Sequence, residues 1–309
     1  MPNKSYGIFL CLISVLIWGT MFPIMRIVLK VMDPFTFTLI RYAIASLILI
    51  PALFLTEGKS FWQAQEVRFK IDGKILLVWL YGSIGFAGFG FFMFFGQKII
   101  GGSTGAINAS TVESTMPVMS ILLLWLINGR KPNIRTFLMI ILSLIGIIFL
   151  IGINNIISLN TNIYGDICLL LGTLSWIIYT TGFKKFPDWS PLKYTALSCF
   201  LGVLTMAAIV PLFDIIGISK IPSVNILYSV WPEILFMAII AGALAVFTWN
   251  IGNNIIGPLN GIFFINLIPI TTLIITLISG GHVKITDYIG MFIVLTAITV
   301  NNIINLSAK

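Results

Sequence analysis

Long apolar runs constrain this chain more than any other feature of its sequence. Ten runs near or above the length that crosses a ~30 Å hydrocarbon layer follow one another with short connections. None of them alternates polar with apolar residues, as a strand of a membrane barrel would. An α-helix satisfies its own backbone hydrogen bonds without water, so the runs predict an all-α polytopic membrane protein with ten transmembrane helices. The runs are Tyr6–Val28, Pro34–Leu55, Ile75–Phe95, Ser103–Ile127, Ile134–Gly152, Ile163–Phe183, Pro191–Phe213, Trp231–Gly252, Gly257–Ile278 and Thr286–Ile304.

The composition agrees with this class and excludes others. Hydrophobic residues make up 58% of the 309 residues and charged residues only 9%, which is too little polar surface for a soluble domain. Cys11, Cys168 and Cys199 fall inside apolar runs without paired spacing, so we expect no metal site and no cofactor. No cleavage-like site follows the first run, and we expect that run to remain in the mature protein.

The basic residues predict how the chain is oriented in the membrane. If the N-terminus is cytoplasmic, twelve Lys or Arg residues lie on the inner side and five on the outer side. This bias predicts a protein of the plasma (cytoplasmic) membrane with both termini cytoplasmic. It also explains the net charge of +8 without a nucleic-acid partner. The inner set is Lys4, Lys59, Arg68, Lys70, Lys74, Arg130, Lys131, Arg135, Lys184, Lys185, Lys193 and Lys309, and the outer set is Arg26, Lys30, Lys98, Lys220 and Lys284.

The two halves of the chain resemble each other. When the chain is aligned with itself, Trp18 matches Trp176 in the first and sixth runs, and Pro117 matches Pro269 in the fourth and ninth. Each half then holds five helices, and because five is odd, the second half must enter the membrane in the opposite orientation. The predicted division is a first repeat over residues 1–153, an external connection over 154–162, and a second, inverted repeat over 163–309.

Two runs that contain proline mark a candidate site. Within Gly102–Ile127, Glu113 lies about 15 Å from the start of the run, near the bilayer midplane, and four residues before Pro117. Proline has no N–H to donate to the carbonyl four residues earlier, so the helix should bend at Glu113. The run Gly257–Ile278 repeats the arrangement with Asn266. We expect the two broken helices to line one site. The predicted hinges are Pro23, Pro117 and Pro269.

Two charged residues, Arg41 and Glu113, lie more than five residues from either end of their apolar runs. Such residues are rare in membranes and usually mark a substrate or proton path, so Glu113 is our candidate for proton coupling as well as for substrate binding. The alternative is a neutral, hydrogen-bonded acid that only ties helices together. Arg41 lies about 10 Å into its run, shallow enough to snorkel or to bond loose helix ends, and we interpret it as structural.

Tryptophans in unusual places extend the candidate site. Indole rings usually mark the membrane interface, yet two tryptophans fall near the middle of their runs. Core packing could explain each of them alone, but their matched placement in both halves favours a pocket. One tyrosine and two asparagines add hydrogen-bonding groups. The predicted substrate-binding set is Trp18, Glu113, Trp176, Tyr179, Asn250 and Asn266.

Several motifs together resemble a known family. In the first half these are Trp18–Pro23, Asp33-Pro34 and Arg41 followed by an aliphatic run. In the second half they are Gly165-Asp166 with Trp176 and Tyr179, Trp249-Asn250, Ile256–Pro258 and Asn266–Pro269. This pattern is similar to EamA-type transporters of the drug/metabolite transporter (DMT) superfamily. The resemblance covers essentially the whole chain. It implies two inverted five-helix repeats and outward transport of small metabolites, often amino acids.

The predicted function is therefore secondary transport of a small metabolite such as an amino acid. Access would alternate around a site near the midplane, and the resemblance implies export. Aromatic faces beside one acid suit an ammonium group next to an apolar body. The alternatives are a multidrug or lipophilic-cation exporter and a membrane channel. No enzyme activity is expected, since catalytic and phosphate-binding motifs are absent from the sequence. The expected partners are the substrate, the lipid bilayer and protons, and the chain is expected to act as a monomer.

Overall fold

The described part of the chain is all helical. The computed structural model describes residues 4–63, 73–129, 134–151, 161–256 and 264–307. Within them, six helices are long and apolar enough to cross a membrane, namely Lys4–Val28, Pro34–Gly58, Lys74–Ile100, Ile163–Lys185, Pro191–Ile215 and Trp231–Ile256. Shorter apolar helices cover Ile134–Gly146, Leu267–Ile278 and Ile285–Val300. These helices agree with a multi-pass membrane protein. The total of ten spans stays a prediction, and the expected connection over 154–162 lies mostly outside the described residues.

The helices follow the predicted order, with shorter pieces where a run is interrupted. The first half contains α1 (Lys4–Val28), α2 (Pro34–Gln63), α3 (Gly73–Gly82), η1 (Ser83–Gly88), α4 (Phe89–Ile100), α5 (Gly102–Ser114), α6 (Met116–Asn128) and α7 (Ile134–Ile151). The second half contains α9 (Thr161–Gly182), η2 (Phe183–Lys185), α10 (Pro191–Ile215), α11 (Val224–Ser229), α12 (Trp231–Leu235), η3 (Phe236–Leu244), α13 (Ala245–Ile256), α15 (Leu267–Ile278) and α16 (Ile285–Ser307). The segments η1 and η3 are π-helical, and each interrupts a long α-helix in its half.

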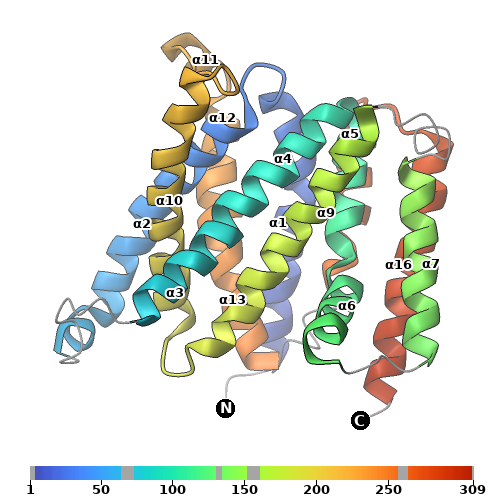
Figure 1. The fold of residues 1–309 in the computed structure, drawn as a ribbon, viewed down its shortest axis with the longest axis horizontal. Helices are drawn as coiled ribbons and strands as arrows, with labels where there is room; N and C mark the ends of the chain where they lie inside the picture. The colour runs from blue at the N-terminus through green and yellow to red at the C-terminus, as the bar shows by residue number, and fades with distance from the viewer. Residues whose placement is uncertain (1–3, 64–72, 130–133, 152–160, 257–263, 308–309) are drawn as a thin grey trace.

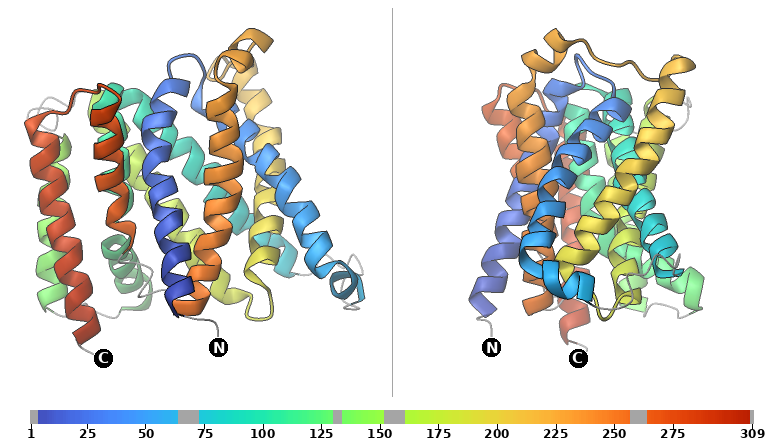
Figure 2. Two further views of the ribbon diagram at one scale, coloured as in Figure 1. Left: turned by 180° about the vertical axis from the view of Figure 1, so that it is seen from behind. Right: turned by 90° about the vertical axis from the view of Figure 1, so that its left-hand side faces the viewer.

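Helices from the two halves are interleaved in one bundle (Figure 1). The helix α1 packs on α13 and α15, α9 packs on α4, and α2 packs on α10. The pair α7 and α16 forms one edge of the bundle (Figure 2). The first turn of α1 and the last turn of α16 lie at the same end of the bundle, as the N and C marks show.

Both predicted helix breaks occur. The first is displaced by two residues, and the run that holds the second begins outside the described residues. The helix α5 ends at Ser114 and α6 begins at Met116, so the first break lies at Thr115 and not at Glu113 as predicted. The Thr115 N–H turns back to the carbonyl of Val112 at 3.0 Å, and a proline in the first turn of the next helix needs no N–H partner. The second break lies at Asn266, directly before α15.

A proline and a glycine set the close contact between α1 and α15. Pro23 leaves the carbonyl of Gly19 without its usual intrahelical partner, and Thr272 Oγ1 donates to that carbonyl at 2.7 Å. A Cβ atom on Gly19 would lie 2.5 Å from Thr271 Cβ and 2.9 Å from Ile268 O. Only glycine therefore allows this approach, and the contact supplies the hydrogen bond that the proline removes.

We predict that Gly19→Ala destabilises the protein by about 1–3 kcal/mol, because the added methyl group forces α15 away from α1. Thermal unfolding of the purified protein in detergent would measure the change. The matched control is Gly58→Ala, because a Cβ there meets no atom within 4 Å. We expect the control not to destabilise the protein, because alanine is favoured over glycine inside a helix by about 0.5–1 kcal/mol. Equal effects of the two substitutions would contradict the proposed packing.

Candidate functional site

Three tryptophans and a tyrosine meet in the interior of the bundle. The ring of Trp18 on α1 lies 6.2 Å from that of Trp176 on α9 and 5.3 Å from that of Trp249 on α13. The ring of Tyr179 lies 5.0 Å from that of Trp176. All four side chains are buried. The structure thus brings together three predicted binding residues, and we call the four residues the aromatic cluster.

Two phenylalanines, Phe86 in η1 and Phe89 at the start of α4, pack against this cluster. The ring of Phe86 in the π-helical segment η1 lies 5.1 Å from that of Tyr179 and 4.9 Å from that of Tyr42 on α2. The ring of Phe89 lies 5.2 Å from that of Trp176. The Phe86 contacts are edge-to-face, which is the favoured geometry because the edge of one ring is positive and the face of the other is negative.

The π-helical segment η3 holds two key side chains through its carbonyls. The indole N–H of Trp18 donates to Ala241 O at 3.2 Å, and Nε of Arg41 donates to Met237 O at 2.9 Å. Turns of this kind are rare and occur often at functional sites. The segment therefore connects α1 and α2 at the depth of the aromatic cluster.

Hydroxyl and amide groups form a neutral network beside Tyr179. The Nδ2 atom of Asn250 donates to Thr195 Oγ1 at 2.8 Å, and Ser198 Oγ donates to Tyr179 Oη at 3.5 Å. The Tyr194 hydroxyl donates to Tyr179 O at 2.7 Å. These bonds connect α9, α10 and α13, so Asn250 lies near the aromatic cluster, in the place expected for a hydrogen-bonding wall.

Two opposite charges are buried near this cluster. Glu113 on α5 is 3% exposed, and Arg41 on α2 is 2% exposed. The helix of Glu113, α5, packs on α1 and α4, which contact Arg41 through Met21 and Phe94. Within the described residues, neither Glu113 Oε2 nor Arg41 Nη1 has a hydrogen-bond partner. Of the two roles expected for Arg41, snorkelling toward the membrane surface is wrong, because the side chain is buried, whereas its Nε does bond a backbone carbonyl, that of Met237 in η3.

The remaining predicted residue, Asn266, points elsewhere. Its Nδ2 atom donates to Thr299 Oγ1 on α16 at 3.0 Å, so it ties α15 to the edge of the bundle. No hydrogen bond or ring contact links it to the aromatic cluster within the described residues. A second buried acid, Asp166, accepts a hydrogen bond of 3.2 Å from Asn108 Nδ2. We did not predict Asp166 as a site residue.

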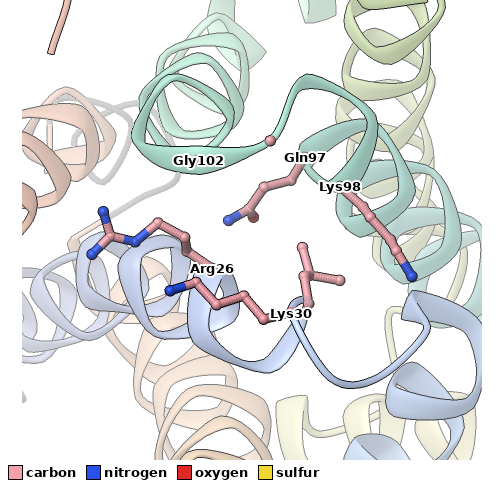
Figure 3. Close-up of a pocket in the computed structure, with 7 residues that line it drawn as sticks. Arg26, Lys30, Gln97, Lys98 and Gly102 are labelled. Carbon is pink, nitrogen blue, oxygen red and sulfur yellow. The ribbon is translucent and has the colours of Figure 1, made fainter. Parts of the chain in front are cut away.

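A pocket of about 200 Å³ lies at one end of the bundle, away from the aromatic cluster (Figure 3). It is lined by Arg26, Leu29, Lys30, Gln97, Lys98, Gly101 and Gly102. Arg26 Nη1 donates to Ser103 Oγ at 2.7 Å, and Gln97 Nε2 donates to Phe22 O at 2.8 Å. The pocket contains no residue of the aromatic cluster, so we place the candidate site by its buried rings and charges instead.

Comparison with known proteins identifies the family. The model of the EamA-like transporter family matches residues 5–152 and 163–303. The chain belongs to the EamA-like transporter family. This EamA-like transporter is 33% identical over 300 residues to the uncharacterized transporter YrdR of Bacillus subtilis (strain 168), covering 96% of this chain and 91% of that protein. The resemblance to the DMT superfamily seen in the sequence is thereby confirmed.

Further similarities agree with this membership. The EamA-like transporter is 26% identical over 310 residues to the uncharacterized transporter YyaM of the same organism, covering 98% of this chain and 96% of that protein. A solved crystal structure superposes with a TM-score of 0.65 at 17% identity and covers 99% of this chain and 100% of that chain. At this identity the superposition shows a shared fold only. Relatives named as transporters support a transport role for this chain.

Within this EamA-like transporter, the binding set predicted from the sequence leaves out Arg41, Tyr42, Phe86, Phe89 and Trp249. The charge of Arg41 inside an apolar run was a usable signal, but its depth was underestimated. Tyr42 and Phe86 gave no signal, because aromatic residues are frequent in all the apolar runs and only the packing of α2 on η1 brings these two together.

We predict that Trp18→Phe destabilises the protein by about 1–3 kcal/mol, because it leaves the carbonyl of Ala241 without its donor. Thermal unfolding in detergent would measure the loss. The control is Trp79→Phe, since Trp79 is 39% exposed and its acceptor Thr205 has other hydrogen bonds. The control should cost less than about 0.5 kcal/mol. A loss at Trp18 no larger than the loss at Trp79 would exclude a role for the hydrogen bond.

Proposed function

We propose that this EamA-like transporter is a secondary transporter of a small zwitterionic or amphipathic metabolite, such as an amino acid with an apolar or aromatic side chain. The substrate would bind at the aromatic cluster and leave the cell by alternating access. One observation carries the proposal: indole and phenol rings from both halves of the chain meet in the interior, and α5, which carries the buried acid Glu113, packs on the helices of Trp18 and Trp176. Aromatic faces and a carboxylate are what an ammonium group beside an apolar body requires.

Alternating access needs two halves that can rock against each other, and we propose that these are inverted five-helix repeats. Three parallels support the proposal. A π-helical segment interrupts a long helix in each half. The contact of α1 with α13 has its counterpart in the contact of α9 with α4, and each half has a helix break before a proline. Pro23, Pro117 and Pro269 remain the proposed hinges, because helices bend where a proline interrupts the hydrogen bonds.

The orientation is also part of the proposal. We infer that the chain acts as a monomer in the plasma membrane with both termini cytoplasmic. The first turn of α1 and the last turn of α16 lie at one end of the bundle, which supports placing both termini on one side of the membrane. The bias of twelve inner against five outer basic residues supports it as well.

A lipophilic-cation exporter is the second candidate, because the same rings and the same acid would hold an organic cation. Nucleotides and sugar phosphates fit less well. Their phosphates need several buried bases, and within the described membrane-spanning interior Arg41 supplies one. A channel would need a ring of polar groups that lines a pore, whereas the aromatic cluster and the buried charges converge on one region.

We predict that cells expressing this transporter survive an overload of phenylalanine-containing dipeptides better than cells without it, because export removes the released amino acid. The double variant Trp18→Ala, Trp176→Ala should lose the protection. Growth in dipeptide medium, with membrane levels of each protein checked, measures the effect.

The matched control is Trp79→Ala, Trp231→Ala, which removes two tryptophans that are 39% and 52% exposed and lie outside the cluster. This control should protect as the wild type does. Protection only against toxic lipophilic cations would favour the second candidate. Equal protection by the wild type and by the cluster variant would place the binding site elsewhere.

We predict that Glu113→Gln abolishes the response of net flux to an imposed pH gradient while counterflow of substrate persists. The glutamine keeps the shape and a hydrogen-bond acceptor but cannot carry a proton. Arg41 is the charged group that faces Glu113, and Asp166 and Asp287 lie on the neighbouring helices α9 and α16. Asp166→Asn and Asp287→Asn are therefore the matched controls.

If export exchanges one substrate for one proton, substrate moves toward the acidic compartment, and each pH unit supports about tenfold accumulation in the wild type. Flux in proteoliposomes with an imposed pH gradient measures this ratio. Wild-type behaviour of Glu113→Gln in both assays would assign Glu113 to the scaffold. Loss of the response in Asp166→Asn or Asp287→Asn alone would move the proton site to that residue.

A further inference from the structure

The guanidinium of Arg41 has partners at Nε and Nη2 but none at Nη1 within the described residues. Its Nε atom donates to Met237 O at 2.9 Å, and its Nη2 atom lies 3.3 Å from the sulfur of Met21. The guanidinium carbon lies 4.8 Å from the ring centroid of Tyr42 and 5.3 Å from that of Phe94. These contacts orient the plane of the guanidinium. They leave Nη1 buried without an acceptor within the described residues.

An arginine in this position calls for an anionic partner. The guanidinium cannot lose its charge in a protein, and its N–H groups form a rigid fork that matches a carboxylate. A buried donor of a charged group without an acceptor is strongly unfavourable. The stacked rings and the single carbonyl acceptor fix the side chain, but they do not neutralise it.

Glu113 Oε2 does not accept a hydrogen bond from Arg41 Nη1. If Oε2 of Glu113 accepted from Nη1 of Arg41, neither atom would lack a partner, and both do within the described residues. Glu113 lies on α5, which packs on α1 and α4, and these two helices contact Arg41 through Met21 and Phe94. A positive and a negative group therefore face the same region of the bundle, and each has an unused hydrogen-bonding atom.

We propose that Arg41 binds the carboxylate of a zwitterionic substrate whose ammonium group is held by Glu113. An α-amino acid carries both charges on one carbon and would satisfy both unused atoms at once. A simple anion would leave Glu113 without a partner, and a simple cation would do the same to Arg41. The rings of Tyr42, Phe86 and Trp176 lie beside this region and would contact the apolar side chain of the substrate.

This inference rests on the proposed function and makes it more specific. It assigns to Arg41 a direct role in substrate selection, in contrast to the structural role expected from the sequence. It also explains why the chain tolerates a buried arginine. A buried charged group without an acceptor is unfavourable, and the carboxylate of the bound substrate would supply that acceptor.

The test compares ligands that differ only at the charged ends. The purified full-length protein in detergent is titrated with L-phenylalanine, L-phenylalaninamide, 2-phenylethylamine and N-acetyl-L-phenylalanine, and intrinsic tryptophan fluorescence reports binding. In the wild type, loss of either charge should weaken binding by at least about tenfold. In Arg41→Gln, the ratio of the affinities for phenylalanine and its amide should fall to about one. Arg41→Lys, which keeps the charge but not the fork, should give an intermediate ratio.

The control Arg26→Gln removes a similar charge that bonds Ser103 and Ser279 at the end of the bundle. It should keep the wild-type ratio. A ratio unchanged in Arg41→Gln would overturn the assignment of Arg41 while amino-acid binding stands. A wild type that binds the amide and the amine as well as phenylalanine, or binds none of the four, would overturn the proposed amino-acid function itself.

If Arg41→Gln does not fold, Gly242→Ala serves as the second variant. A methyl group on Gly242 would lie 3.5 Å from Arg41 Nε and 2.9 Å from Met237 O, so it disturbs the bond between them without removing the charge. We expect a selective loss of affinity for phenylalanine relative to its amide. An equal loss for both ligands would contradict a contact between Arg41 and the carboxylate.

Discussion

The structure depends on one constraint of the membrane interior, which is that buried polar groups must find their partners within the protein. Pro23 frees the carbonyl of Gly19, and Thr272 on another helix supplies the missing donor. Two carbonyls of the π-helical segment η3 accept hydrogen bonds from Trp18 and Arg41. Irregular backbone thus becomes the means by which distant helices are joined at the depth of the candidate site.

The same constraint gives meaning to the groups that stay without partners. Tight packing and many hydrogen bonds surround the aromatic cluster. Within the described residues, however, Glu113 Oε2 has no donor and Arg41 Nη1 has no acceptor. In a transporter such groups are useful. In the function proposed above, a substrate that carries the complementary charges would bind by completing the network, and its release would leave both atoms without partners again.

Much of this arrangement could be predicted from the sequence, and the exceptions have physical reasons. Run length and periodicity predict the helices, because the bilayer fixes the length of a span. The matched positions of Trp18 and Trp176 predicted that the two rings belong to one site, since repeated elements place equivalent residues at equivalent depths, and the rings do meet. The direction of Asn266 and the burial of Arg41 could not be predicted. Both depend on contacts between separate helices, because Asn266 bonds Thr299 on α16 and Arg41 on α2 bonds Met237 in η3.

The central claim is that the region around Arg41 and the aromatic cluster is the transport site and opens to each side of the membrane in turn. Met21 tests it directly, because its sulfur contacts Arg41. Met21→Cys would be placed in a protein whose three native cysteines are replaced, and labelled in proteoliposomes with an impermeant thiol reagent added to one side at a time. For a variant that retains counterflow, the account predicts labelling from either side, slowed by L-phenylalanine. Labelling from one side only, or from neither, while counterflow persists would contradict it.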